Sequence, residues 1–270
     1  MGKTIVSWSP VHGQSGTTSN IAALASMFAL KYQTRNLITH TQLTYSSLES
    51  LFGKEILEGG FEGGMTALER LAKSHLLKTE AVMDYTESIY NGRLDILGGT
   101  KQPESNQELV EILITILRDA YDIVWIDAHS GGYNNLSLGL LESADIVLVN
   151  LPQNRFVLDR FFEGYDFPEV LKDKEIIVLI SSYDEESSFS VKKIKRRYKT
   201  KYEVLPIHYS HHFKDAANKL MLSEFFYRTH SVERQHPSYN FIKSLDTVNK
   251  VIAKRVGVHK AREREEDEEE

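Results

Sequence analysis

The sequence predicts an α/β fold, a doubly wound, mostly parallel sheet with helices on both faces. Short apolar runs typical of buried strands alternate with stretches of helical periodicity along most of the 270 residues. Repeated strand–helix units favour parallel strands joined by right-handed crossovers. A glycine-rich turn directly follows the first apolar run, at the place where such sheets bind ligands. The hydrophobic content of 41% suffices for one sizeable core.

The expected elements follow one another as strand and helix pairs. The first strand covers residues 4–7, and the helix that begins near Thr17 and ends at Lys31 places four apolar residues on one face: Ile21, Leu24, Ala25 and Phe28. Further strands are expected at 36–38, 93–99, 121–127, 144–152, 175–184 and 202–208. Helical patterning returns at 67–77 and at 104–120, where five residues are expected to face the core: Leu109, Ile112, Leu113, Ile116 and Leu117.

The turn at residues 7–19 has the composition of a phosphate-binding loop without lysine or arginine. Gly13 and Gly16 can adopt positive φ and let phosphate oxygens approach the chain. Successive backbone N–H groups and the positive end of the helix dipole attract the anion. In a GxxxxGK[ST] loop, Thr18 would be the magnesium ligand, and Thr17 replaces the lysine. We therefore predict that main-chain amides hold the phosphates.

The loop segment His12-Gly-Gln-Ser-Gly-Thr-Thr18 resembles the KGGxGK[ST] loop of the ParA/MinD family of deviant Walker-A P-loop ATPases, which form nucleotide-dependent sandwich dimers. His12 stands where that family has its signature lysine, and the GTT ending is similar to the TadZ/CpaE-like pilus-assembly branch. The resemblance implies a P-loop NTPase fold, a homodimer, and binding of ATP or ADP with Mg²⁺. It implies nucleotide contacts from His12, Gly13, Gln14, Ser15, Gly16, Thr17, Thr18 and Ser19.

Later segments resemble the same family in the same order. Asp127-Ala-His-Ser-Gly131 ends an apolar run and fits the family's DxxxG switch. The resemblance implies that Asp127 is catalytic and holds magnesium through water, together with Thr18, and that the Gly131 N–H senses the terminal phosphate. The ends of the strands at 175–184 and 202–208 are similar to segments that hold the base, which implies contacts from Ser182, Tyr183, Pro206 and Ile207.

One segment departs from the family. Thr39-His-Thr-Gln-Leu43 stands where relatives carry aspartates that position the attacking water. The imidazole of His40 is a poor substitute for a carboxylate, which only accepts hydrogen bonds. We therefore expect slow or absent hydrolysis. The implied role is a dimerising localisation or assembly factor for a pilus, secretion or conjugation machine, with a protein partner specific to that machine.

Two alternative functions remain open. A DNA-partitioning ATPase would bind DNA non-specifically, and residues 191–201 supply seven candidate cations: Lys192, Lys193, Lys195, Arg196, Arg197, Lys199 and Lys201. We favour a solvated helix face, partly neutralised by the acidic residues 184–186, because no aromatic residues interleave the basic ones. The other alternative is a pseudo-ATPase scaffold that dimerises without nucleotide. The loop would then be a turn that binds nothing, with Thr17, Thr18 and Ser19 only capping a helix.

Three histidines, His12, His40 and His129, can converge if the loop and both switches surround one ligand. Imidazoles can donate to phosphate or ligate a transition metal. The three histidines are not accompanied by an HExxH motif or by paired carboxylates at metal-binding spacing. The same holds for the histidine pair at residues 211–212. We predict no metal-based catalysis from these histidines and keep His12 as a phosphate contact.

We expect one domain over residues 1–258 and a disordered acidic tail over 259–270. The chain has no cysteine, no apolar segment typical of a signal peptide and no run of transmembrane length, so we expect a cytoplasmic location. An apolar stripe at 241–256 is expected to pack on the core rather than on a membrane, because an anionic leaflet repels the acidic tail. The sequence assigns no role to residues 45–91.

Overall fold

The computed structural model describes residues 1–42, 46–54, 64–99, 107–131 and 135–259. Its eight-stranded sheet has the order β3-β4-β2-β5-β1-β6-β7-β8, with β1 inside the sheet and crossovers to both sides of it. Every strand pairing is parallel except that of β3 with β4 at one edge. The predicted doubly wound α/β class is therefore confirmed.

The strands are β1 (Lys3–Trp8), β2 (Asn36–His40), β3 (Glu87–Tyr90), β4 (Leu94–Ile96), β5 (Ile123–Asp127), β6 (Ile146–Pro152), β7 (Ile176–Tyr183) and β8 (Glu203–His208). The α-helices are α1 (Thr17–Lys31), α2 (Leu48–Leu51), α3 (Gly64–Lys73), α4 (Gln107–Ala120), α5 (Asn135–Ser143), α6 (Arg155–Phe162), α7 (Val191–Tyr198), α8 (His211–Asn218), α9 (Leu222–Thr229) and α10 (Tyr239–Val256). Two 3₁₀ segments are η1 (Thr79–Tyr85) and η2 (Glu169–Leu171). The sequence does not predict β3, an edge strand whose side chains are exposed or half-buried.

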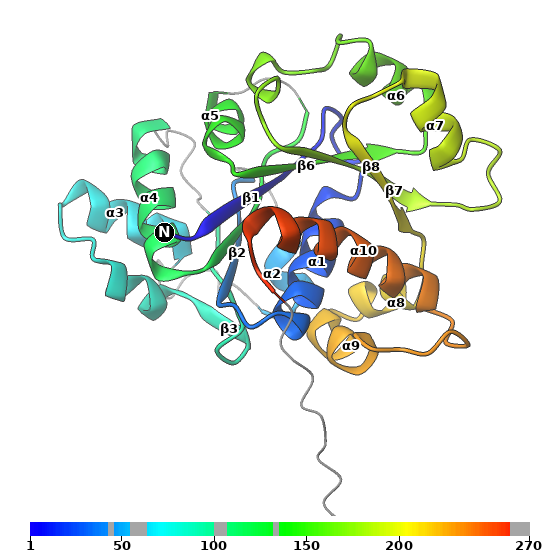
Figure 1. Ribbon diagram of the computed structural model, residues 1–270. Coiled ribbons are helices and arrows are strands. Elements are labelled where there is room, and N and C mark those ends of the chain that lie inside the picture. Colours follow the sequence, from blue (N-terminus) through cyan, green and yellow to red (C-terminus); the bar gives the residue numbers. More distant parts are fainter. Residues whose placement is uncertain (43–45, 55–63, 100–106, 132–134, 260–270) are drawn as a thin grey trace, which may run out of the picture.

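Helices cover both faces of the sheet (Figure 1). On one face, α1, α2, α9 and α10 share a buried cluster with alternate strand residues such as Ile5 and Trp125. On the other face, α3, α4, α5, α6 and α7 pack over the intervening residues, such as Val6 and Val124. Successive strand residues point to opposite faces, so each strand contributes to both halves of the core. The carboxyl ends of the strands between these layers are the place for a ligand.

Two helices differ from the sequence prediction. Helix α1 is buried all round over residues 20–29, not only on the predicted face, because α9 and α10 cover its outer side. In α4, Leu109, Leu113 and Leu117 are buried as predicted, but Ile112 is 45% exposed. The buried leucines recur every four residues and form one stripe, and Ile112 lies beyond it. The predicted residues 104–106 of this helix lie outside the described part.

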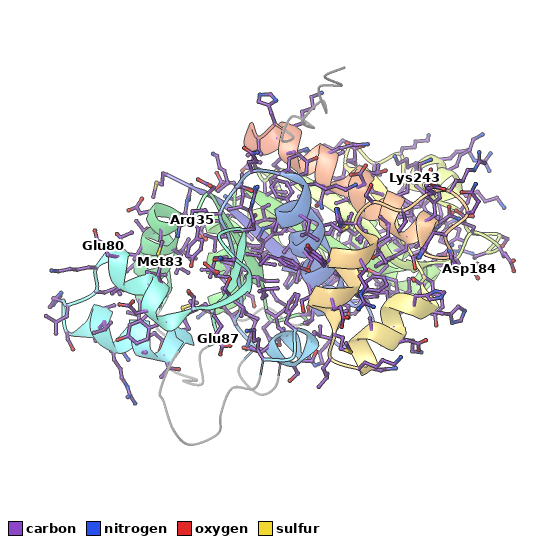
Figure 2. The ribbon with its side chains drawn as sticks, turned by 90° about the horizontal axis from the view of Figure 1, so that it is seen from below. Arg35, Glu80, Met83, Glu87, Asp184 and Lys243 are labelled. Atoms are coloured by element: carbon purple, nitrogen blue, oxygen red, sulfur yellow. The ribbon has the colours of Figure 1, made fainter. Side chains whose placement is uncertain are left out.

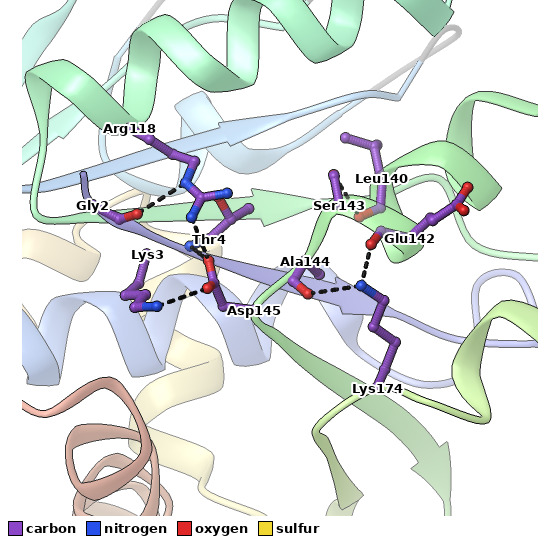
Figure 3. Close-up of polar contacts among 10 residues, drawn as sticks. All are labelled: Gly2, Lys3, Thr4, Arg118, Leu140, Glu142, Ser143, Ala144, Asp145 and Lys174. Carbon is purple, nitrogen blue, oxygen red and sulfur yellow. Dashed lines mark hydrogen bonds and ion pairs between the residues drawn. The ribbon is translucent and has the colours of Figure 1, made fainter.

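The amino ends of the central strands are tied by polar contacts (Figure 3). Asp145, just before β6, accepts a hydrogen bond from the Lys3 Nζ atom at 3.0 Å and another from the Thr4 N–H at 2.9 Å. The Arg118 guanidinium of α4 lies 3.2 Å from the same carboxylate. Lys174, before β7, donates to two carbonyl oxygens around the end of α5. These contacts lie at the strand ends opposite to the glycine-rich loop, and they hold β1, α4 and β6 together.

Residues 46–54 and 64–91 form α2, α3, η1 and β3, whereas residues 55–63 of this region lie outside the described part. Figure 2 shows Arg35, Met83 and Glu87 at the end of the molecule opposite to Asp184 and Lys243. The Arg35 guanidinium donates to the Met83 sulfur at 3.3 Å and so ties η1 to the start of β2. The described parts of this segment thus add edge strand β3 to the sheet and pack α3 and η1 on α4.

Helix α10 packs on α1, as predicted for the apolar stripe at 241–256, and buries Phe241, Ile242, Leu245, Val248 and Ile252. Within the described ranges, no helix combines the length and apolar character needed to cross a membrane. Asp246 of α10 accepts hydrogen bonds from Lys31 of α1 and from Lys250, both at 2.8 Å. Burial alone would raise the pKa of Asp246, but the hydrogen bonds from Lys250 and Lys31 outweigh it and hold the pKa below its ordinary value.

We expect Asp246→Asn to lower the free energy of unfolding by about 1 kcal/mol at pH 7, because the pair joining α1 to α10 is lost. The pKa is depressed in the folded state, so the carboxylate stabilises the protein above its unfolded-state pKa of about 4. That contribution is lost as the pH falls through the lower folded-state pKa. Urea unfolding at pH 7 and at about pH 3 measures it. The control is Asp173→Asn, at an exposed carboxylate; an equal loss in both variants contradicts this account.

Candidate phosphate-binding site

The glycine-rich loop joins β1 to α1, and hydrogen bonds of its serine hydroxyls fix its conformation. The buried Ser9 Oγ donates to the Ser15 Oγ at 2.8 Å and accepts from the Val11 N–H at 3.2 Å. These bonds pull both ends of the loop toward the sheet, while residues 12–14 remain exposed. The exposed part therefore stands above the carboxyl ends of β1 and its neighbour β5.

Gly13 and Gly16 have φ of 72° and 57°, the left-handed region that the sequence predicts for them. Apart from the adjoining residues of the loop, no heavy atom of the described residues lies within 4 Å of a Cβ built at either position, so there is open space beside the chain. Gly16 is also the N-cap of α1, and neither a side-chain cap nor an acidic residue occupies the first turn. The amides and the dipole of this helix end are thus available to an anion.

The hydroxyls after Gly16 contact the end of β5 and the segment that follows it, and they do not cap the helix. Thr17 Oγ1 lies 3.3 Å from Ser130 Oγ, and Thr18 Oγ1 donates to Asp127 Oδ2 at 2.5 Å. Helix capping, the alternative use of these residues, is therefore not what Thr17 and Thr18 do. The structure brings together Thr18 and Asp127, the two residues expected near magnesium.

Asp127 is fully buried, and its Oδ1 atom has no hydrogen-bond partner in the described part of the chain. Burial raises the pKa of this carboxyl to about 7, although the hydrogen bond from Thr18 and the proximity of His40 act in the opposite direction. An unsatisfied carboxylate oxygen beside a threonine hydroxyl fits a hard cation that prefers oxygen ligands, such as Mg²⁺. Thr18 and Asp127 would hold the ion, which would neutralise charge on a bound polyphosphate.

A buried amide network beneath the loop fixes α1 on the sheet, and sequence analysis missed it. The Asn20 side chain donates to Asn150 Oδ1 and to Ser181 Oγ, both at 2.8 Å. Asn150 in turn donates to Ser7 Oγ at 2.9 Å. The signal available in the sequence was an asparagine inside the apolar run of β6, a position where a polar residue needs partners.

His40 is paired with a carboxylate that sequence analysis did not find. Its Nδ1 accepts from the Gln42 N–H at 3.1 Å, so Nε2 carries the proton donated to Glu49 Oε1 at 2.8 Å. Burial would raise the pKa of Glu49, but the hydrogen bond from His40 contributes to holding it below its ordinary value. A Cβ on Gly99 would lie 2.2 Å from the His40 ring, so only glycine fits there. With both nitrogens engaged, His40 is not free to contact phosphate.

Gly131 of the second switch has φ of 87°, and its N–H donates to the Ser9 carbonyl oxygen at 2.9 Å. A Cβ at this position would lie 3.4 Å from the His12 Cβ, so the switch packs closely on the loop. The predicted contact of the Gly131 N–H with a terminal phosphate would require this bond to break. Residues 132–134, which follow directly, lie outside the described part.

Of the three histidines, His12 and His129 converge at the loop. Their ring centroids are 5.5 Å apart. His129 Nδ1 lies 2.9 Å from the side-chain oxygen of Gln42, the second residue after β2. Burial lowers the pKa of His129, and the neighbouring His12 lowers it further. The described residues contain no cluster of three or more metal-ligating His, Cys, Asp or Glu side chains.

The residues expected to contact the nucleotide base lie farther from the glycine-rich loop than Asp127 does. Asp127 ends β5, the strand next to β1, whereas β7 and β8 are the second and third strands from β1 on the other side. Ser182 is exposed with φ of 47°, and the buried Tyr183 ring packs edge-on against His208. Pro206 and Ile207 lie inside β8, and the Ile207 side chain is in the core, 2% exposed. An Ile207 side-chain contact with the base is therefore not supported. The exposed aromatic at this strand end is Tyr209.

The order of the sheet and the loop after β1 are similar to the fold of ParA and MinD ATPases of known structure. No family model matches the sequence, and no curated protein matches it significantly. A ParA family ATPase from Chlorobium tepidum has a similar structure, with a TM-score of 0.72 and 12% identity over 93% of this chain and 99% of its own. MinD from Pyrococcus horikoshii, complexed with Mg-ADP, has a TM-score of 0.69 and 15% identity over 94% and 99%. An ATP complex of Cyanothece McdA has a TM-score of 0.69 and 16% identity over 97% and 99%.

We expect Asp127→Asn to stabilise the magnesium-free protein by about 2 kcal/mol more at pH 8 than at pH 5. The pKa is raised in the folded state, so the folded protein binds more protons than the unfolded chain between about pH 4 and pH 7. The free energy of unfolding therefore falls as the pH rises through this window. Asp127→Asn has no carboxylate at this position, so its free energy of unfolding does not fall in this way. Urea unfolding in EDTA at both pH values measures it. Equal destabilisation at pH 5 and pH 8 would refute the raised pKa.

Proposed function

We propose that this chain binds ATP or ADP with Mg²⁺ through the main-chain amides of its glycine-rich loop and hydrolyses the nucleotide slowly or not at all. It would act in the cytoplasm as a homodimeric localisation or assembly factor for a pilus, secretion or conjugation machine. The observation that carries the proposal is the left-handed pair Gly13 and Gly16 beside open space, at an uncapped helix end. Such a loop attracts phosphate without any ammonium group.

The choice of ligand rests on the cation site and on the fold. The contact between Thr18 and Asp127, with an unsatisfied Asp127 Oδ1, suits Mg²⁺ next to a polyphosphate. Solved neighbours with the same fold are complexes with Mg-ADP and with ATP. A loop without lysine lacks the charge-assisted hydrogen bonds that strengthen phosphate binding, so the affinity would be weak. Contacts would come from residues 12–19, with Gly131 and the surface around Ser182 and Tyr183 as further contributors.

We expect slow hydrolysis because the described part of the site lacks both a lysine at the phosphates and a free carboxylate for the attacking water. Thr17 occupies the position of the lysine that stabilises developing charge on phosphate. Glu49, which sequence analysis missed, accepts hydrogen bonds from His40 and from the Gly99 N–H, so it is not free to orient a water molecule. The GTT ending of the loop supports a likeness to the TadZ/CpaE-like branch, and with it the assembly role and the machine-specific partner. We treat residues 1–258 as the unit that binds and dimerises.

Gly16→Val is expected to weaken ATP–Mg²⁺ binding by more than tenfold, or about 1.4 kcal/mol, because valine at positive φ distorts the loop and fills its open space. Isothermal titration calorimetry measures the affinity. The matched control is Gly92→Val, since Gly92 also has positive φ and open surroundings but lies in the β3–β4 turn. Unchanged affinity in Gly16→Val, with binding intact in the control, removes the loop as the site.

Light scattering during the same titration separates the three functional classes. Saturable binding with dimer formation and negligible phosphate release supports the assembly factor. Phosphate release that DNA stimulates supports a partitioning ATPase. Dimers that form without nucleotide support the pseudo-ATPase scaffold. The main proposal is wrong if the wild-type protein binds no adenine nucleotide.

Helix α7 favours DNA binding as a second candidate. Only Ile194 of this helix is buried, and Lys192, Lys193, Lys195 and Arg196 are exposed without an ion-pair partner in the described ranges. Among the described residues, the expected neutralisation by residues 184–186 is not observed. Glu185 pairs with His208, and the α7 cation that pairs with a carboxylate there is Arg197, with Asp159 of α6. Two exposed rings add stacking surfaces beside Arg160: Phe156 on α6 and Tyr165 just after it, at 70% and 69% exposure. Helix α6 is joined to α7 through Asp159 and Arg197.

Reversing the charges with Lys192→Glu, Lys193→Glu and Lys195→Glu is expected to weaken binding of duplex DNA at least tenfold and to flatten its salt dependence. Phosphate contacts release counterions, so the slope of affinity against salt reports how many are lost. Fluorescence anisotropy between low and physiological salt measures both. Lys78→Glu, Lys214→Glu and Lys219→Glu reverse three exposed charges elsewhere and form the control. Equal effects of both triple variants would indicate net charge rather than a site on α7.

A further inference from the structure

Gln42 and His129 form a hydrogen-bonded pair from two different strand ends. Gln42 follows β2, and His129 follows β5 in the second switch. The Gln42 Nε2 atom lies 3.3 Å from the Ala128 carbonyl oxygen, and Oε1 lies 2.9 Å from His129 Nδ1. A carbonyl oxygen only accepts, so the amide nitrogen of Gln42 must face Ala128 and its oxygen must face His129.

This orientation fixes a proton on the imidazole. Because Gln42 Oε1 is an acceptor, His129 Nδ1 must be the donor and carries a hydrogen. In the neutral ring, the other nitrogen, Nε2, is then a bare acceptor. No hydrogen bond of the described residues uses His129 Nε2, and the ring stands beside His12 at the loop, with centroids 5.5 Å apart.

We infer that Gln42 is a positioning residue, which holds His129 in the Nδ1–H tautomer so that Nε2 accepts a hydrogen bond from a water molecule at the loop. This inference rests on the proposed function and deepens it. The lone pair on Nε2 repels unprotonated phosphate oxygens but attracts an O–H group, so water is the ligand that fits between this nitrogen and a terminal phosphate. The pair thus supplies the acceptor that the segment at residues 39–43 lacks.

Nearby groups are less suited to hold this water. His40 uses both ring nitrogens, for the Gln42 N–H and for Glu49. The Asp127 carboxylate is fully buried and bonded to Thr18. His129 is half-buried and lies on the same side as the loop, since its neighbour Gly131 bonds to Ser9.

The slow hydrolytic step would balance as follows. The water oxygen forms a bond to the γ-phosphorus as the bond from that phosphorus to the bridging oxygen breaks, and ADP leaves with the electron pair. One proton of the water passes to His129 Nε2, and the imidazolium then releases it to solvent. Gln42 Oε1 stabilises the ring throughout by accepting the Nδ1–H bond.

¹⁵N NMR of the histidine rings tests the tautomer without any nucleotide, at about pH 8.5, two units above the ordinary histidine pKa of about 6.5. The resonances of His129, assigned by their loss in His129→Gln, are expected to show a protonated Nδ1. Gln42→Met removes the acceptor with little change in shape and is expected to shift the ring toward Nε2–H. Gln42→Glu keeps an acceptor oxygen and is expected to retain Nδ1–H. An Nε2–H ring in the wild type, or no change in Gln42→Met, overturns the inference.

Single-turnover phosphate release with protein in excess over ATP tests the water. Gln42→Met and His129→Gln are expected to slow release at least fivefold while ATP affinity stays within about twofold, since Nε2 favours no phosphate contact. Wild-type protein that binds ATP but releases no phosphate, or variants that release it at the wild-type rate, overturns the water-holding role. If no adenine nucleotide binds at all, the proposed function fails as well, whereas the NMR result bears on the positioning by Gln42 alone.

Discussion

The hydrogen bond from Thr18 to Asp127 is the contact on which the arrangement of the site depends. It joins the first turn of α1 to the end of β5 at 2.5 Å and leaves the second carboxylate oxygen buried without a partner. Burying a carboxylate in this way is costly, which is why its pKa rises to about 7. A cation at this point would relieve the cost, so the burial of Asp127 that destabilises the ligand-free protein favours a bound cation.

The fold could be predicted from the sequence because its signals are local. Apolar runs and glycine turns report on strands and loops wherever they occur, and Gly13 and Gly16 adopt the positive φ that their place in the loop requires. The edge strand β3 was missed because its half-exposed residues carry no apolar alternation. Ile112 was misplaced because the width of a helical stripe depends on which neighbours pack against it, and these are not encoded locally.

Sequence reasoning reached the candidate site only where its residues lie within one motif. It singled out the loop residues and Asp127, but it missed Glu49 and Asn150, because each meets its partner through tertiary packing. A carboxylate nine positions beyond His40, on a separate short helix, gives no sign of that pairing in the sequence. The orientation of Gln42 needs still more information, since it depends on a backbone carbonyl in another strand's loop.

The close fit of Gly99 against His40 has a consequence for how this chain diverged. The imidazole occupies the volume of a side chain at position 99, and its proton needs the acceptor on α2. Either group without the other would be a buried polar side chain without its hydrogen-bond partner. Positions 40, 49 and 99 should therefore vary together among homologues of this chain, and an aspartate introduced at position 40 would face the Glu49 carboxylate unless that residue changed as well.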